Sequence, residues 1–274
     1  MRIEHIAAFS TSGIGGNPAG VALCEILPEV DEMQRIAREI GYSETVFAAP
    51  LGKAWRVRYF SPAMEVPFCG HATIALGAIL ARSRGEGIFS LQLNDTAITV
   101  EGHAGTTLGA ALQSPPTRSE PCPEDLLAAA LHLFALEPGN LDNHLPPAII
   151  EAGARHLVLA LSDRDHLAAM AYDLATGADL MRAHGLATIA LVYAETTSRF
   201  HARNAFAAGG VFEDPATGAA AAALGGYLRD LGWPHDGNIE IMQGEDMGQP
   251  CRLIVTIPDR PGASVRVSGA ARLL

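Results

Sequence analysis

The feature that most constrains the fold of this chain is an internal repeat of one short segment. VPFCGHATIALGAIL (Val66–Leu80) recurs in altered form within EDPATGAAAAALGGYL (Glu213–Leu228). With Gly70 aligned on Gly218, a shift of 148 residues, the copies share Pro67, Gly70, Ala72, Ala75, Leu76, Gly77 and Leu80. Each copy predicts a helix that opens with glycine, so the repeat predicts two similar halves. Chance similarity between two Ala/Gly-rich helices would give the same pattern.

Strand signals dominate the rest of the chain. They are short, often alternating runs bounded by Gly, Pro, Asn or Asp, over residues 2–9, 53–60, 87–93, 96–102, 155–161, 186–194, 238–244, 251–257 and 264–269. Helical patterns outside the repeat cover residues 31–41, 123–136 and 164–174. The two repeat helices are so rich in Gly and Ala that neighbours could approach them on every side, which suits helices enclosed by strands. We expect two α+β halves.

A proline-rich segment near mid-chain marks the expected boundary between the halves. LQSPPTRSEPCPED (Leu112–Asp125) contains four prolines and few apolar residues, so it is predicted to be a linker. We expect an N-terminal half over residues 1–117 and a C-terminal half over residues 118–263, with a cleft between them. A last strand, at about 264–274, is expected to return to the first half.

Composition and charge restrict the partners of the chain. The formal net charge is −11 without any basic run, which argues against nucleic acid or an anionic membrane as partner. The N-terminal MRIEHIAAFS lacks a signal-peptide pattern, and no apolar run approaches the roughly 18 residues of a membrane span, so we expect a cytoplasmic protein. The four cysteines are widely scattered and no histidines have ligand-like spacing, so neither disulfides nor a metal site is expected.

The two predicted helix starts suggest an anion-binding site. The first N–H groups of a helix have no intrahelical partner, and glycine lets a ligand approach them closely. Starts at Gly70 and Gly218 that face each other across a cleft would bind an anion without a charged side chain.

Three polar residues near these segments are candidates for acid–base chemistry. Glu44, in GYSETVF, precedes an apolar strand and could be a buried general base, or else a solvated turn residue or a helix cap. His71 could act on a substrate or be a satisfied histidine of a first helical turn. Asp214 could do the same, or be a cap or a turn residue before proline.

Five blocks of the sequence resemble the signature blocks of the PhzF family, and they occur in the family's order. They are GNPAGVAL (16–23), GYSETVF (41–47), RYFSPAMEVPFCGHAT (58–73), EDPATGAA (213–220) and QGEDMGQP (243–250). The resemblance therefore covers essentially the whole chain.

The resemblance implies a diaminopimelate-epimerase-like fold: two pseudo-symmetric halves, each with a sheet wrapped around a central helix, and an active site between them. It also implies a homodimer and cofactor-free proton transfer, since in the phenazine-pathway member a glutamate moves a proton within dihydro-hydroxyanthranilate. By their places in the blocks, Glu44, His71 and Asp214 would be the catalytic residues. The residues expected to bind substrate are Asn17, Gly70, Thr217, Gly218 and Ala219.

Departures from the family pattern bear on the substrate and on the mechanism. Ala219 stands where a serine is frequent, and Gln249 stands where an arginine is common. Some relatives of this fold place a thiol at each helix start. Cys69 occupies one such place, but its counterpart in the repeat is Thr217, so Cys69 is interpreted as a packing residue.

The sequence thus predicts a cofactor-independent isomerase that acts on a small carboxylated substrate through a Glu44 proton shuttle. The alternative is a non-catalytic binding or interaction protein that keeps the fold, and the presence of Glu44, His71 and Asp214 argues against it. A dinucleotide-dependent oxidoreductase is not expected, because GIGGNPAG has Pro18 at the third glycine of G-x-G-x-x-G.

Overall fold

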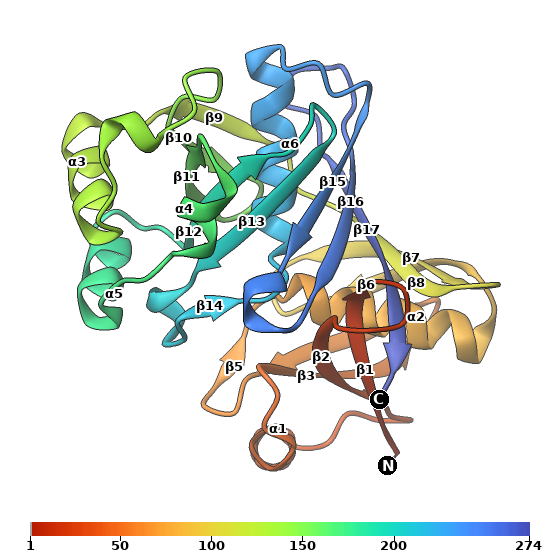
Figure 1. Cartoon of the computed structure of the whole chain (residues 1–274). Helices are drawn as coiled ribbons and strands as arrows, with labels where there is room; N and C mark the ends of the chain where they lie inside the picture. Colours follow the sequence, from red (N-terminus) through yellow and green to blue (C-terminus); the bar gives the residue numbers. More distant parts are fainter. Residues whose placement is uncertain (1) are drawn as a thin grey trace. The chain divides into compact units, whose positions relative to one another are not determined.

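The computed structural model describes residues 2–274, which form two compact units (Figure 1). The N-terminal unit consists of the chain up to Gln113 together with Ser268–Leu274, and the C-terminal unit is Ser114–Val267. Among residues 2–274, no helix is long and apolar enough to cross a membrane.

Strands of the N-terminal unit surround one helix. Its elements are β1 (Ile3–Ser10), β2 (Asn17–Leu23), α1 (Val30–Ile40), β3 (Glu44–Leu51), β4 (Ala54–Phe60), β5 (Glu65–Val66), α2 (Gly70–Arg84), β6 (Gly87–Gln92), β7 (Ala97–Ala104), β8 (Leu108–Gln113) and most of β17 (Arg266–Leu273). β2 runs parallel to β3, and β4 to β6, whereas the β1–β2, β3–β4, β6–β7 and β7–β8 pairs are antiparallel. β17 pairs with β1, so a segment that follows the whole C-terminal unit completes this sheet.

Small residues allow α2 to lie at the centre of the N-terminal unit. The helix contacts β1, β2, β3, β6, β7 and β8, and its residues from His71 to Ala81 are all buried. A Cβ atom placed on Gly77 would lie 2.5 Å from Cγ2 of Val100, and one on Gly102 of β7 would lie 2.2 Å from the carbonyl oxygen of Gly77. The close approach of helix and strand therefore requires glycine on both sides.

α1 is amphipathic and leads the chain into β3. Its buried residues, Met33, Ile36 and Ala37, pack in a cluster with Phe47 and Phe60 of the neighbouring strands. The helix ends at Gly41, whose φ of 74° is the left-handed conformation common at helix ends. Three residues later β3 begins, which fixes the position of its first side chain.

The C-terminal unit repeats the plan of strands around a helix. Its elements are β9 (Arg118–Pro121), α3 (Glu124–Leu133), η1 (Pro138–Asn140), β10 (Ala148–Glu151), β11 (Arg155–Leu161), α4 (Arg164–Ala168), α5 (Leu174–Ala183), β12 (Thr188–Ala194), β13 (Arg199–Ala205), η2 (Ala207–Gly209), β14 (Glu213–Asp214), α6 (Gly218–Leu231), β15 (Asn238–Gln243), η3 (Glu245–Met247) and β16 (Cys251–Thr256). β11 runs parallel to β12, and β13 to β15, whereas β9–β10, β10–β11, β12–β13, β13–β14 and β15–β16 are antiparallel. A separate apolar core packs α3 and α5 against β11 and β12.

α6 is the central helix of this unit and the counterpart of α2. Every residue from Ala220 to Arg229 is buried, and the helix contacts β9, β10, β11 and β16. A Cβ atom on Gly225, the repeat counterpart of Gly77, would lie 2.8 Å from Cγ1 of Val255. The predicted starts are confirmed, because α2 begins at Gly70 and α6 at Gly218. Both helices are also enclosed by strands, as predicted.

The helix predicted over residues 164–174 starts at Arg164 as expected but ends at Ala168, so its predicted length is wrong. The chain forms α4 there and then, after a break, a second helix, α5, that the sequence pattern missed. An aspartate caps the start of each helix, since Asp163 accepts the backbone N–H of His166 and Asp173 accepts that of Thr176. The second cap lies inside the predicted helix and starts a new one that runs beyond it, to Ala183.

The predicted linker over residues 112–125 also contains regular structure. Its residues Arg118–Pro121 form β9, which pairs antiparallel with β10, and Glu124 and Asp125 already belong to α3. Proline is tolerated because this strand is short and its last residue is the proline itself.

Candidate active site

Glu44, the proposed proton carrier, is the first residue of β3 and lies at the end of the turn that follows α1. In the sheet it lies opposite Ala19 of the parallel strand β2. Its side chain is 17% exposed, while the next five residues of β3 are buried. The carboxylate therefore lies where the core meets the surface, accessible yet held by rigid strands.

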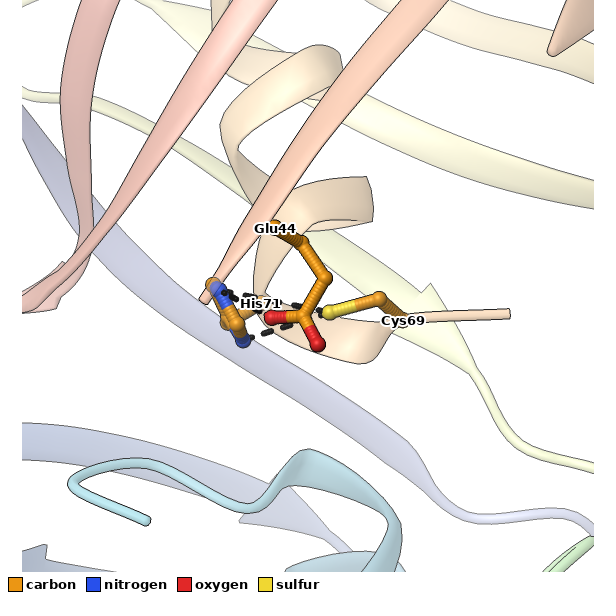
Figure 2. Close-up of side chains that lie close together, drawn as sticks. All are labelled: Glu44, Cys69 and His71. Carbon is orange, nitrogen blue, oxygen red and sulfur yellow. Dashed lines mark hydrogen bonds and ion pairs between the residues drawn. The ribbon is translucent and has the colours of Figure 1, made fainter. Parts of the chain in front are cut away.

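The start of α2 brings two further side chains to Glu44. Figure 2 shows the carboxylate of Glu44, the imidazole of His71 and the thiol of Cys69 pointing toward one another. Nε2 of His71 lies 3.4 Å from Oε2 of Glu44, and Nδ1 of His71 lies 3.3 Å from Sγ of Cys69. The hydroxyl of Ser43 lies 3.3 Å from the same Nε2. The imidazole is thus the centre of a compact polar group.

Two hydrogen bonds hold the first turn of α2 in place. The hydroxyl of Thr73 donates to the carbonyl of Cys69 at 2.7 Å, and the buried hydroxyl of Tyr59 bonds to Thr73 at 2.7 Å. Since Thr73 already donates, Tyr59 must be the donor. Burial raises the pKa of Tyr59 well above its usual range, so the phenol stays protonated in this role. Cys69 is the N-cap residue of α2, and its side chain makes no capping hydrogen bond.

Asn17 and Gly70 lie near these residues in the fold. Asn17 is the first residue of β2, is 2% exposed and pairs with Ala8 of β1. It precedes by two positions Ala19, the residue of β2 that lies opposite Glu44. Gly70 is the first residue of α2 and is half-buried. The N-terminal unit therefore contains four of the predicted site residues, of which Glu44 and His71 lie close enough to interact.

The other predicted site residues lie in the C-terminal unit, at the start of α6. Asp214 is the last residue of β14, Thr217 is the N-cap of α6, and Gly218 and Ala219 form its half-buried first turn. The hydroxyl of Thr217 donates to Oδ2 of Asp214 at 2.6 Å. The structure therefore brings Asp214 and Thr217 together.

Gln243 organises this second group and was not predicted from the sequence. Its side-chain amide donates to the carbonyl of Asp214 at 2.6 Å and to the hydroxyl of Thr217 at 3.1 Å. Its Oε1 accepts the backbone N–H of Thr217 at 3.2 Å. The signal in the sequence was its place as the first residue of the QGEDMGQP block, which says nothing about what the side chain contacts.

A buried ion pair holds the residue next to Asp214. Arg203 of β13 donates to both carboxylate oxygens of Glu213, with a shortest distance of 2.5 Å, and the two side chains are 9% and 2% exposed. The same guanidinium donates to the carbonyl of Ala168 at 2.8 Å. β14 is thereby tied to β13 by side chains as well as by its short ladder, which restricts where Asp214 can lie.

Glu44, Cys69 and His71 also have side chains of the types that bind metal ions. One ligand atom from each lies within 4.8 Å of the others. The spacing of residues along the chain gave no sign of this group, because Glu44 comes from a different element.

Comparisons with known proteins identify the family. The model of the PhzC-PhzF family, described as phenazine biosynthesis-like protein, matches residues 6–274. The uncharacterized isomerase YddE of Escherichia coli (strain K12) is 30% identical over 290 residues, which cover 100% of this chain and 96% of the relative. The trans-2,3-dihydro-3-hydroxyanthranilate isomerase of Pseudomonas aeruginosa is 32% identical over 278 residues, 97% of this chain and 93% of that protein.

Solved structures confirm the fold class. A PhzF-family protein from Bacillus anthracis superposes with a TM-score of 0.85 at 22% identity, covering 100% of this chain and 98% of that one. A predicted epimerase from Pseudomonas aeruginosa gives 0.84 at 25% identity, covering 100% and 96%. A probable proline racemase from Agrobacterium radiobacter gives 0.62 at 11% identity, covering 99% and 90%, a likeness of fold alone. The chain therefore belongs to the PhzC-PhzF family of phenazine biosynthesis-like proteins and is an isomerase with an epimerase-type α+β fold.

Proposed function

We propose that this isomerase moves a proton within a small carboxylated substrate without a cofactor, and that Glu44 carries the proton. Its carboxylate would remove a proton from carbon and return it elsewhere on the same molecule, so that no atom is gained or lost. The proposal rests on one observation, the 3.4 Å contact between Oε2 of Glu44 and Nε2 of His71 at the partly exposed edge of a rigid sheet. A base needs such fixed geometry before its strength matters.

In this proposal His71 holds and polarises the substrate. Its ring lies between the thiol of Cys69 and the carboxylate of Glu44 and is 5% exposed, so it cannot swing away. A proton on Nε2 would orient the carboxylate or be given to an oxygen of the substrate. Either action would stabilise negative charge that develops when the C–H bond breaks.

The starts of the two central helices suit a carboxylated substrate. The N-cap residues of α2 and α6, Cys69 and Thr217, make no capping hydrogen bond through their side chains. The first N–H groups of a helix have no intrahelical partner and can bind an anion. The relative from Pseudomonas aeruginosa is named for an anthranilate derivative, which carries a carboxylate. We assign Asn17, Gly70, Thr217, Gly218 and Ala219 to substrate binding and Asp214 to orienting the substrate.

The proposal is tested by proton exchange with solvent. Small unsaturated carboxylates, beginning with trans-2,3-dihydro-3-hydroxyanthranilate, are incubated with the protein in deuterated water and the products are analysed by mass spectrometry. We expect a substrate that isomerises and gains deuterium at carbon. Glu44→Gln keeps the shape of the side chain but removes the proton carrier, and it should lower turnover by about 10²- to 10⁴-fold.

Glu39→Gln is the matched control, because Glu39 is an exposed carboxylate of α1 that forms a surface ion pair with Arg35. This variant should turn over at the wild-type rate. If Glu44→Gln isomerises the same substrate as fast as Glu39→Gln does, Glu44 does not carry the proton.

A further inference from the structure

We propose that Glu44, Cys69 and His71 form a binding site for one thiophilic divalent cation of the zinc type. The site is a tight group of three different ligand types, with one atom of each within 4.8 Å of the others. Thiolate, imidazole and carboxylate are the three side-chain groups that bind Zn²⁺ in proteins. Three protein ligands leave a fourth coordination position open to water or to another small ligand.

The three ligand atoms lie close together, although the thiol must move for one ion to bind them all. Sγ of Cys69 lies 4.0 Å from Nε2 of His71, and this nitrogen lies 3.4 Å from Oε2 of Glu44. Bonds of about 2.3 Å from zinc to sulfur and about 2.0 Å to nitrogen put those two ligand atoms roughly 3.5 Å apart. Sγ lies nearer to Nδ1 of His71, at 3.3 Å, than to Nε2, so it must move from the Nδ1 side of the ring toward Nε2 before one ion can bind all three atoms. Rotation of the Cys69 side chain would supply this movement.

The charge of the site matches a divalent ion. When a cation binds, Cys69 loses its thiol proton to solvent and forms a metal–sulfur bond, Glu44 is a carboxylate, and His71 is neutral. The two negative ligands then cancel the charge of the ion in a place where Glu44 is 17%, Cys69 9% and His71 5% exposed. An ion held there would not be left as an uncompensated buried charge.

The backbone that carries the ligands is rigid. Cys69 and His71 lie on the anchored first turn of α2, where Thr73 bonds to the carbonyl of Cys69. Glu44 comes from β3, which is hydrogen-bonded to strands on both sides. Binding would therefore order only side chains and not a loop, which lowers the entropic cost of binding.

The same carboxylate cannot bind a cation and accept a proton. Resting here on the proposed function, we infer that a bound zinc-type ion inhibits isomerisation reversibly and that a chelator restores it. Cys69 would then be more than the packing residue that its place in the sequence indicates.

Cobalt(II) provides the test, because it follows zinc in its choice of ligands and absorbs light. Metal-free full-length protein is titrated with Co²⁺ in the absence of substrate, and the thiolate-to-cobalt charge-transfer band is recorded in the near ultraviolet. We expect this band to saturate at one ion per chain and Zn²⁺ to abolish it by displacement. Cys69→Ser should lose the band and bind Co²⁺ roughly tenfold or more weakly.

Cys24→Ser is the matched control, because Cys24 is a half-buried thiol of the same unit whose Sγ contacts a backbone carbonyl. It should keep the wild-type band. Absence of a saturable band in the wild type, or a band that survives in Cys69→Ser, would overturn the proposal. If Cys69→Ser does not fold by circular dichroism, His71→Gln decides: weaker Co²⁺ binding supports the site, and unchanged binding refutes it.

The cobalt titration and the deuterium-exchange assay test the two proposals separately. The cobalt band needs no substrate, whereas deuterium exchange is measured on metal-free protein. Loss of Co²⁺ binding with intact isomerisation would reject the cation site alone, and the reverse result would reject the proton shuttle alone.

Discussion

At the scale of single residues, buried polar side chains of the C-terminal unit decide how stable it is as pH changes. His156 of β11 is 1% exposed, and its Nδ1 lies 2.8 Å from the hydroxyl of Thr188. That hydroxyl donates to Oδ1 of Asn204, so it accepts the Nδ1 proton and fixes the tautomer of His156. Nε2 of His156 has no hydrogen-bond partner within residues 2–274, and burial lowers the pKa of His156 to about 4.

The low pKa of His156 predicts acid sensitivity. A pKa below the unfolded value of about 6.5 means that its contribution to stability is complete above that pH and is lost as the pH falls toward 4. From pH 7.5 to pH 5 we expect the wild type to lose about 2 kcal/mol of unfolding free energy through this group. Urea unfolding at the two pH values measures it. His156→Asn cannot titrate, and an equally large loss in that variant would contradict the prediction.

Gln243 supports a second prediction at this scale. Removal of its side chain leaves the backbone N–H of Thr217 and the carbonyl of Asp214 without these partners. Gln243→Ala should therefore lower the free energy of unfolding by about 1–3 kcal/mol and lower turnover through a displaced Asp214. Gln249→Ala, an exposed side chain of the same block, should leave stability nearly unchanged. Equal stability of the two variants would show that the Gln243 bonds are not important.

At the scale of elements, the contact between α2 and β7 determines the fold of the N-terminal unit. Gly102→Ala would place a methyl group 2.2 Å from the carbonyl oxygen of Gly77, a backbone atom that cannot rotate away. We expect a loss of about 3 kcal/mol or more in the free energy of unfolding. Gly87 of β6, the residue opposite Gly102, has open space at its Cβ position, so Gly87→Ala is the control. If both variants unfold at the same urea concentration, the helix is not packed as tightly as described.

The same contact shows what could be predicted from the sequence. The repeated small-residue pattern predicted both enclosed helices and their starts at Gly70 and Gly218. The enclosure could be predicted because glycine is needed where helix and strand meet closely, at Gly77 and Gly225. Periodicity failed at residues 164–174, where the cap at Asp173 starts a new helix. The contact of His71 with Glu44 and the contacts of Gln243 with Asp214 and Thr217 could not be predicted, since they join residues that are distant in sequence. The assignment of the catalytic residues stays a prediction.

At the scale of the whole molecule, we expect a homodimer. Large apolar side chains remain exposed on the single chain, among them Ile88 of β6, which is 72% exposed. Light scattering at micromolar concentration should give twice the chain mass of 28.7 kDa. A mass equal to that of one chain would rule out this assembly.

The position of β17 affects how the molecule can fold during synthesis. β1 pairs with β2 on one side and with β17 on the other, and the residues of β17 that do so follow the entire C-terminal unit in the chain. On the ribosome, β1 must therefore wait with one edge unpaired while the C-terminal unit is made, and an unpaired edge is where strands of other nascent chains can attach. The C-terminal unit can complete its own sheet first. The part of the protein that is translated earliest is thus completed last.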